Sequence, residues 1–229
     1  MRRVGKMTSN YNDAIYSILG QTLQLMAERA IFWQEHQTLL VADLHLGKEG
    51  TFRAAGIPLP EGPSRDTVER LEKALSRTQA KRLVILGDLF HGDSAVVSSG
   101  TLIDGLRSRF AELHIDLISG SHDRWSGNLP EKWRFNIHSA GMHAPPFLFR
   151  HYPETEEGSY VLSGHIHPGF LLRDKQSGET MKLSCFHFKE SLGILPAFGS
   201  FTGLTTISSL AEELNYVIAE RSVLLVPGE

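Results

Sequence analysis

Four short motifs rich in aspartate and histidine each follow an apolar run along this chain of 229 residues. An apolar run of this length predicts a buried strand. Loops at the carboxyl ends of strands in an open α/β sheet converge on a single crevice. We therefore expect the motif side chains to meet at one edge of a sheet. The motifs are, in order, Asp43-Leu44-His45, Gly87-Asp88, Gly120-Ser121-His122-Asp123 and Gly164-His165-Ile166-His167.

The composition restricts the classes of protein that this chain can belong to. Its 41% hydrophobic and 21% charged residues are ordinary for a globular domain. We expect no membrane span, because no apolar run reaches the roughly 18 residues of a membrane helix, and the N-terminus lacks the apolar stretch of a signal peptide. The single cysteine, Cys185, excludes an internal disulfide and favours a cytoplasmic protein. The net charge of −3 gives no global attraction for nucleic acid.

The order of the predicted elements favours one α/β domain. Residues 1–20 are polar and poorly patterned, so we expect a loosely ordered extension before a single domain over residues 21–229. Residues 29–33 and 38–42 predict a hairpin. A helix is predicted to start with Ser64 as its N-cap, and a second one to cover about residues 98–111.

After residue 119 the pattern changes mainly to strands. Alternating β/α units followed by a strand-rich half predict two packed sheets with outer helices. The strands are expected at residues 146–150, 159–163, 170–173, 181–188 and 192–195, followed by a hairpin of residues 216–219 and 222–226.

The motif residues have the chemistry of metal ligands. Residues two apart on an extended segment point the same way, so Asp43 and His45 can reach one ion. The two imidazoles of His165 and His167, also two apart after an apolar strand, are hard to explain by structure alone. The first of these pairs alone is explained as well by surface side chains in a loop. Clustered imidazoles and carboxylates bind divalent metals, and the joint occurrence of all four motifs at strand ends predicts a metal site.

The motif order resembles that of the calcineurin-like metallophosphoesterases, whose pattern runs D-x-H, G-D, G-N-H-D, a further His, and G-H-x-H. The resemblance covers roughly residues 38–200. It implies a four-layer α/β/β/α metallophosphoesterase sandwich of two mixed sheets flanked by helices, with a two-metal site. The implied ligands are Asp43, His45 and His167 for the first ion, Asp88 as a bridge, and His165 and His151 for the second.

The lone histidine of the pattern has two candidates in this sequence. His151 follows the apolar residues 147–149 and precedes Tyr152-Pro153, as the resemblance requires. His143 precedes Ala144-Pro145-Pro146 and does not end an apolar strand. We therefore assign His151 to the second ion.

Ser121 departs from the pattern, which normally has an asparagine ligand of the second metal at this position. A serine hydroxyl is shorter and a poorer ligand, so it binds weakly, acts through a water or leaves that position empty. We therefore expect a strong first site and a weaker second one. The resemblance implies Mn²⁺ at both, and the ligand set also accepts Fe or Zn.

His122 resembles the motif histidine that contacts the phosphate and protonates the leaving group. Asp123 is its neighbour in that motif, with a structural role. The alternative for His122 is a packed loop histidine without a part in catalysis.

Four further segments resemble one branch of the superfamily, the bacterial ligase-associated DNA damage response endonucleases. This resemblance implies a manganese-dependent DNA endonuclease in DNA repair, associated with an ATP-dependent DNA ligase and a helicase. The segments are residues 42–58, which start Ala42-Asp43-Leu44-His45-Leu46-Gly47-Lys48-Glu49, residues 86–91, residues 163–169, and residues 195–203, which contain Pro196-Ala197-Phe198-Gly199.

Several side chains beside the metal motifs are candidates for contacts with substrate phosphates. They are Lys48, Arg53, Arg124 and His91, with Arg150 a weaker one. Each cation is explained equally well as a solvated loop residue, and His91 as a packing residue. The sequence shows no aromatic platform for stacking bases.

Two other functions stay open at this point. A phosphomonoesterase or a small-molecule phosphodiesterase would use the same chemistry, and the acidic net charge favours it slightly. A non-catalytic scaffold, as the retromer subunit with this fold is, fits the departure at Ser121 but not the presence of His122, His165 and His167.

Overall fold

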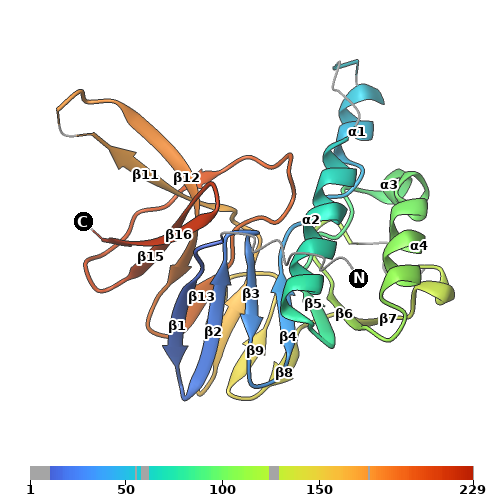
Figure 1. The fold of residues 1–229 in the computed structure, drawn as a ribbon, viewed down its shortest axis with the longest axis horizontal. Coiled ribbons are helices and arrows are strands. Elements are labelled where there is room, and N and C mark those ends of the chain that lie inside the picture. The colour runs from blue at the N-terminus through green and yellow to red at the C-terminus, as the bar shows by residue number, and fades with distance from the viewer. Residues whose placement is uncertain (1–10, 55, 58–61, 124–128, 175, 229) are drawn as a thin grey trace, which may run out of the picture.

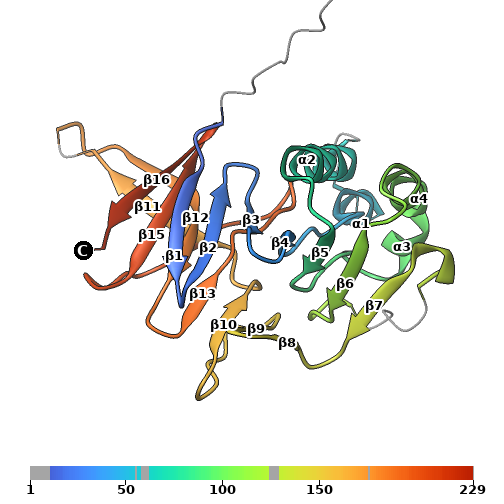
Figure 2. The same ribbon diagram turned by 60° about the horizontal axis from the view of Figure 1, so that its bottom comes forward.

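The computed structural model describes residues 11–228, except residues 55, 58–61, 124–128 and 175. Two mixed β-sheets pack face to face, and helices cover the outer face of the first (Figures 1 and 2). This arrangement confirms the two mixed sheets of an α/β fold that the sequence predicts.

The first sheet is antiparallel at one end and parallel at the other. Its strands lie in chain order: β1 (Ala14–Ile18), β2 (Gln21–Met26), β3 (Ala30–Trp33), β4 (Thr38–Val41), β5 (Arg82–Ile85), β6 (His114–Ile118) and β7 (Phe135–His138). The first four strands pair antiparallel and confirm the predicted hairpin as β3 and β4. Strands β4 to β7 pair in parallel, so their carboxyl ends share one edge.

The second sheet contains most of the strands predicted after residue 119. Its main path is β14 (Thr205–Thr206), β11 (Pro168–Arg173), β12 (Thr180–Phe188), β13 (Leu192–Ile194), β10 (Tyr160–Ser163), β9 (Phe147–Phe149) and β8 (Met142–Ala144). The predicted C-terminal hairpin is present as β15 (Leu214–Ala219) and β16 (Ser222–Pro227), joined to the sheet through β12. Strands β9 and β10 are parallel neighbours, so the loops that follow them also lie together.

The α-helices of the described residues all belong to the first half of the chain. They are α1 (Lys48–Ala54), α2 (Pro63–Thr78), α3 (Asp93–Ser98) and α4 (Gly100–Arg109), followed only by the 3₁₀ helix η2 (Glu131–Trp133). The predicted helix over residues 98–111 is present as α4, which Ser99 separates from α3. None of the described helices is long and apolar enough to span a membrane.

Two apolar layers hold the sheets and helices together. In each central strand of the first sheet, successive side chains face opposite sides. Leu39 and Val41 pack under α2 and α4, whereas Leu40 faces the second sheet and packs with Phe149 and Leu162. The outer face of the second sheet carries no α-helix among the described residues, so the fourth layer that the resemblance implies is not formed there by an α-helix.

The start of α2 differs in detail from the prediction. The helix begins at Pro63 with Gly62 as its N-cap, and Ser64 does not cap it. Instead, the Ser64 hydroxyl donates a hydrogen bond of 2.8 Å to Glu49 Oε2 and accepts one from the Gly47 N–H. Ser64 therefore ties α1 to α2 close to His45.

Residues 11–20 are not the loosely ordered extension that their polarity predicts. Strand β1 pairs with β2 over its whole length, and Asn12 exchanges backbone hydrogen bonds with Arg221 and Val223 beside β16. The Arg77 guanidinium of α2 bonds both Asp13, at 2.5 Å, and Glu28, at 2.7 Å. This segment therefore links α2 to both sheets.

We expect Arg77→Met to destabilise the fold by about 3 kcal/mol, because the carboxylate of Glu28, a residue only 2% exposed, would lose its ion-pair partner. Urea unfolding measures the loss. The matched control is Arg109→Met, whose exposed pair with Glu72 is worth less than about 1 kcal/mol. Equal, small losses in both variants would show that the ion pairs of Arg77 contribute little to the stability of the fold.

Candidate metal centre

The six aspartate and histidine residues predicted as ligands come together in space, although they follow four different strands. Asp43 and His45 follow β4, and Asp88 follows β5. His151 follows β9, and the pair His165 and His167 follows β10. The site therefore lies where the carboxyl ends of strands from both sheets meet.

Asp43, His45 and His167 form one group of ligand atoms. The Nε2 atoms of His45 and His167 are 3.2 Å apart, and His167 Nε2 lies 3.7 Å from Asp43 Oδ1. Asp43 Oδ1 is buried without a hydrogen-bond partner, whereas Oδ2 accepts the backbone N–H of His165 at 2.8 Å. A buried carboxylate oxygen without a partner is costly, so this group fits a bound cation.

Asp88, His151 and His165 form a second group. His151 Nδ1 donates a hydrogen bond of 2.9 Å to the carbonyl of Leu86, which leaves Nε2 free for a metal. His151 Nε2 lies 3.0 Å from His165 Nδ1 and 3.6 Å from Asp88 Oδ2. The same Asp88 oxygen is 3.9 Å from His45 Nε2 in the first group, so Asp88 lies between the two groups as a bridging ligand would.

The backbone of the site adopts the left-handed conformation, which residues other than glycine rarely take. Five of the six candidate ligands have a positive φ, which costs each L-residue free energy and persists only where the surrounding structure enforces it. The φ angles are 54° for Asp43, 47° for His45, 51° for Asp88, 75° for His165 and 49° for His167.

Two motif glycines leave room for the ligands. A Cβ at Gly87 would lie 2.1 Å from His151 Nδ1, and φ at this residue is +87°. A Cβ at Gly120 would lie 2.3 Å from Asp88 Oδ1. Any side chain at either position would displace a candidate ligand, and this close contact explains why both positions are glycine.

Burial keeps several imidazoles of the site neutral. Desolvation lowers the pKa of His45 to about 2, with a further contribution from His167. Desolvation also lowers the pKa of His165, followed by the effect of His151. Neutral imidazoles have a free electron pair, so protons compete little with a metal for these ligands at neutral pH.

Asp123 has a structural position in its motif. Its Oδ2 accepts the backbone N–H of Asp88 at 2.7 Å and that of Gly120 at 2.9 Å. Burial raises the pKa of Asp123 to about 6. Through its two hydrogen bonds, the Asp123 carboxylate joins the loop that carries Asp88 to the loop that carries Ser121 and His122.

Ser121 contacts the candidate ligand Asp88. Its hydroxyl donates to the Asp88 carboxylate, at 3.0 Å from Oδ2 and 3.3 Å from Oδ1. The neighbouring backbone N–H of His122 also bonds Asp88 Oδ1, at 2.8 Å. Ser121 thus orients the candidate bridging carboxylate.

His122 and His91 lie together beside the first group. The two rings stack with centroids 4.8 Å apart, and the His122 centroid is 5.3 Å from that of His45. His122 is exposed and therefore accessible to a substrate. Burial lowers the pKa of His91 to about 4, with a further effect of His122.

The candidate cations differ in their surroundings. Lys48 is partly buried near His45 and His91, and burial lowers its pKa. Arg53 is exposed and lines a cavity of about 310 Å³ with Arg65. Arg150 forms an ion pair with Glu156 and is not available without breaking it. Arg124 lies outside the described residues.

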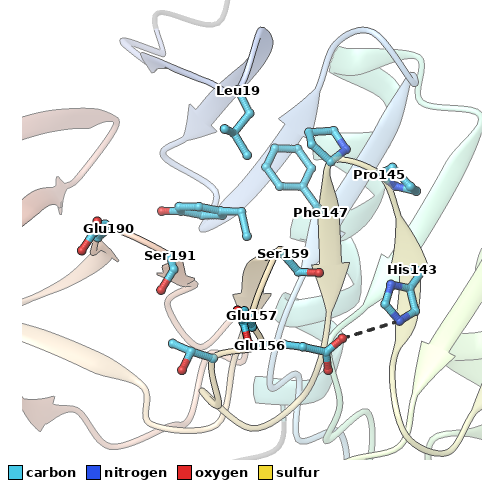
Figure 3. Close-up of a pocket in the computed structure, with 13 residues that line it drawn as sticks. Leu19, His143, Pro145, Phe147, Glu156, Glu157, Ser159, Glu190 and Ser191 are labelled. Atoms are coloured by element: carbon cyan, nitrogen blue, oxygen red, sulfur yellow. Dashed lines mark ion pairs between the residues drawn. The ribbon is translucent and has the colours of Figure 1, made fainter.

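His143, the alternative to His151, lies in a different pocket (Figure 3). This cavity of about 770 Å³ is lined by the first residue of β9, Phe147, and by none of the candidate ligands. His143 is exposed, and its Nε2 is 3.9 Å from Glu156 Oε1. The geometry therefore favours His151.

Three aromatic side chains beside the site have no counterpart in the predicted set. Tyr152 is 42% exposed, and its ring lies 4.8 Å from that of His151 and 4.7 Å from that of His165. Phe52 of α1 and the exposed Phe201 lie on the side of His91. The position of Tyr152 next to His151 in the sequence was a usable signal, whereas nothing local marks the phenylalanines.

Two packed sheets whose strand ends bring groups of candidate metal-binding side chains together are the arrangement expected of a metallophosphoesterase, a metal-dependent hydrolase of phosphate esters. The chain belongs to this superfamily and is a metal-dependent phosphoesterase. It is similar to a nuclease of Pseudomonas putida, MPE. The two share 31% identity and superpose with a TM-score of 0.80 over 94% of this chain and 100% of that one.

A second solved structure, the Escherichia coli phosphoesterase Yfce, has 14% identity and a TM-score of 0.45 over 84% of this chain and 99% of that one. No family model and no curated protein sequence matches the chain.

We expect titration of the wild-type chain with Mn²⁺ to show one tight and one weaker ion, because Ser121 replaces an amide ligand of the second. In Gly87→Ala only the tight ion should remain, since the new methyl group displaces His151 and leaves the first group in place. The matched control is Gly178→Ala, which has a similar φ of +74° but nothing within 4 Å of the added Cβ. Two equally tight ions in the wild type, or two ions in Gly87→Ala, would contradict this assignment.

Proposed function

We propose that the protein is a manganese-dependent DNA endonuclease that acts in DNA repair and hydrolyses internal phosphodiester bonds. The observation that carries this proposal is the convergence of six candidate ligands, among them Asp43, whose buried Oδ1 has no hydrogen-bond partner. The similarity to a nuclease over nearly the whole chain supports DNA as the substrate.

The proposed ligands divide as the two groups do. Asp43, His45 and His167 would hold the first ion, His151 and His165 the second, and Asp88 both. Bound there, two divalent ions would supply a water acidic enough to attack phosphorus near neutral pH and would neutralise charge on the phosphate. Imidazoles with carboxylates suit Mn²⁺, and Fe or Zn also fit this donor set.

His122 is the proposed general acid. Its ring is exposed beside the first group, and its backbone N–H is fixed on Asp88. From this position the imidazolium would donate its proton to the leaving oxygen as the bond to phosphorus breaks. The stacked His91 ring would keep the His122 ring from turning away.

The substrate backbone would be held by cations beside the site. Lys48 lies close to His45 at the start of α1, and Arg53 is exposed on the same helix. Contacts of this kind position a nucleic acid without selecting its sequence. We propose the same role for Arg124, and a hydrogen bond to the substrate from the neutral ring of His91.

The proposal extends to the setting of the enzyme. DNA as a substrate and a buried, free Cys185 suit the cytoplasm, where thiols stay reduced. Functional association with an ATP-dependent DNA ligase and a helicase completes the proposed repair role.

The decisive experiment incubates the purified chain and Mn²⁺ with circular plasmid and, separately, with simple phosphate monoesters and diesters. We expect nicking by the wild type and none by His45→Ala, which loses a ligand of the first ion. Hydrolysis of monoesters with intact plasmid would identify a phosphomonoesterase instead. Bound metal without any hydrolysis would identify a scaffold.

A second prediction concerns the leaving group. We expect His122→Ala to slow DNA cleavage by a factor of about 10²–10⁴, because an alkoxide leaves poorly without a proton. Cleavage of a nitrophenyl ester, whose leaving group needs no proton, should fall much less. Rates on the two substrates measure the difference, and equal losses on both would reject the role of general acid.

A further inference from the structure

Two phenylalanines from distant parts of the chain meet beside the metal centre. Phe52 lies on α1, which begins three residues after His45, and Phe201 lies in the loop that follows Gly199. Their rings are 5.8 Å apart at 90°, an edge-to-face pair. Phe201 is 38% exposed and Phe52 is partly buried, so the pair presents apolar aromatic surface to solvent.

The loop that carries Phe201 is fixed to the candidate ligands at both ends. The N–H of Gly199 donates to the carbonyl of Asp43 at 3.0 Å, and the N–H of Thr205 donates to the carbonyl of His167 at 3.0 Å. Both residues belong to the first group of ligands. The position of Phe201 is therefore set by the same backbone that sets the metal site.

A row of rings connects the pair to the proposed general acid. Phe52 stacks on His91, with centroids 6.5 Å apart and planes 26° apart. His91 in turn stacks on His122, at 4.8 Å and 30°. Only the ring of His91 thus lies between His122 and Phe52. This short separation suits a nucleobase attached close to the scissile phosphate.

We propose that Phe52 and Phe201 form a subsite that binds a nucleobase next to the scissile phosphate by stacking. This inference rests on the proposed nuclease function and identifies which part of the substrate contacts these rings. Each base has a flat π face that stacks on an aromatic side chain, so the subsite accepts any base and needs no hydrogen bond to it. Lys48 at the other end of α1 would hold the backbone while the base stacks.

The test compares two strands of equal length with the same phosphates, a normal DNA oligonucleotide and one made entirely of abasic residues. Phe201→Ala should raise KM for the normal strand about tenfold and leave KM for the abasic strand unchanged. Phe201→Tyr, which keeps a ring, should restore the wild-type value. The control is Leu224→Ala, an exposed apolar residue on β16.

The position of the subsite is measured with a set of DNA strands, each with a single abasic residue at a different position. In the wild type we expect weaker cleavage when the missing base is adjacent to the cut. In Phe201→Ala this dependence should disappear. Equal effects of Phe201→Ala on normal and abasic strands, or no effect on either, would overturn the proposal.

Fluorescence anisotropy with the same two strands separates this inference from the nuclease proposal. Binding that depends on the bases and on Phe201 supports the subsite even if no strand is cut, in which case the nuclease proposal alone fails. Cleavage without any such dependence rejects the subsite and leaves the nuclease proposal intact.

Discussion

The left-handed backbone at five of the six candidate ligands is the constraint on which the site depends. A residue with positive φ turns the chain sharply at the end of a strand, and this turn lets a short loop aim two side chains at one point. Such residues cost free energy, so the rest of the molecule must hold them in place. Strain of this kind concentrates at functional sites, where the geometry gained is worth its cost in stability.

The hydrogen bonds between loops supply that support. The N–H groups of Asp43 and His45 donate to the carbonyls of Gly87 and Asp88, so the first two motifs are joined directly. Asp123 joins the third motif to the second, and Asp43 Oδ2 joins the fourth to the first. The apolar layer that the two sheets share beneath the site is buried. These contacts hold the candidate ligands in the positions described above.

The sequence predicted the central strands and the gathering of the ligands because both signals are local. An apolar run followed by Asp or His at fixed spacing identifies β4, β5 and β10 and the residues after them. The sequence did not predict strand β1, because its side chains are all at least partly exposed and form no buried apolar run. Its stability comes from pairing with β2 and from the contact of Arg77 with Asp13. The hydroxyl of Ser64 has two partners far away in the sequence. The ring pair of Phe52 and Phe201 exists only once the chain is folded, so no local pattern reveals it.

The loop from Gly199 to Thr205 connects the proposed base-binding rings to the candidate metal ligands. Its two ends are hydrogen-bonded to the backbones of Asp43 and His167, so a shift of the loop would move two candidate ligands of the first ion. Under the proposed function, whatever factor a base on the rings applies to the affinity for the cation, the cation must apply to the affinity for the base.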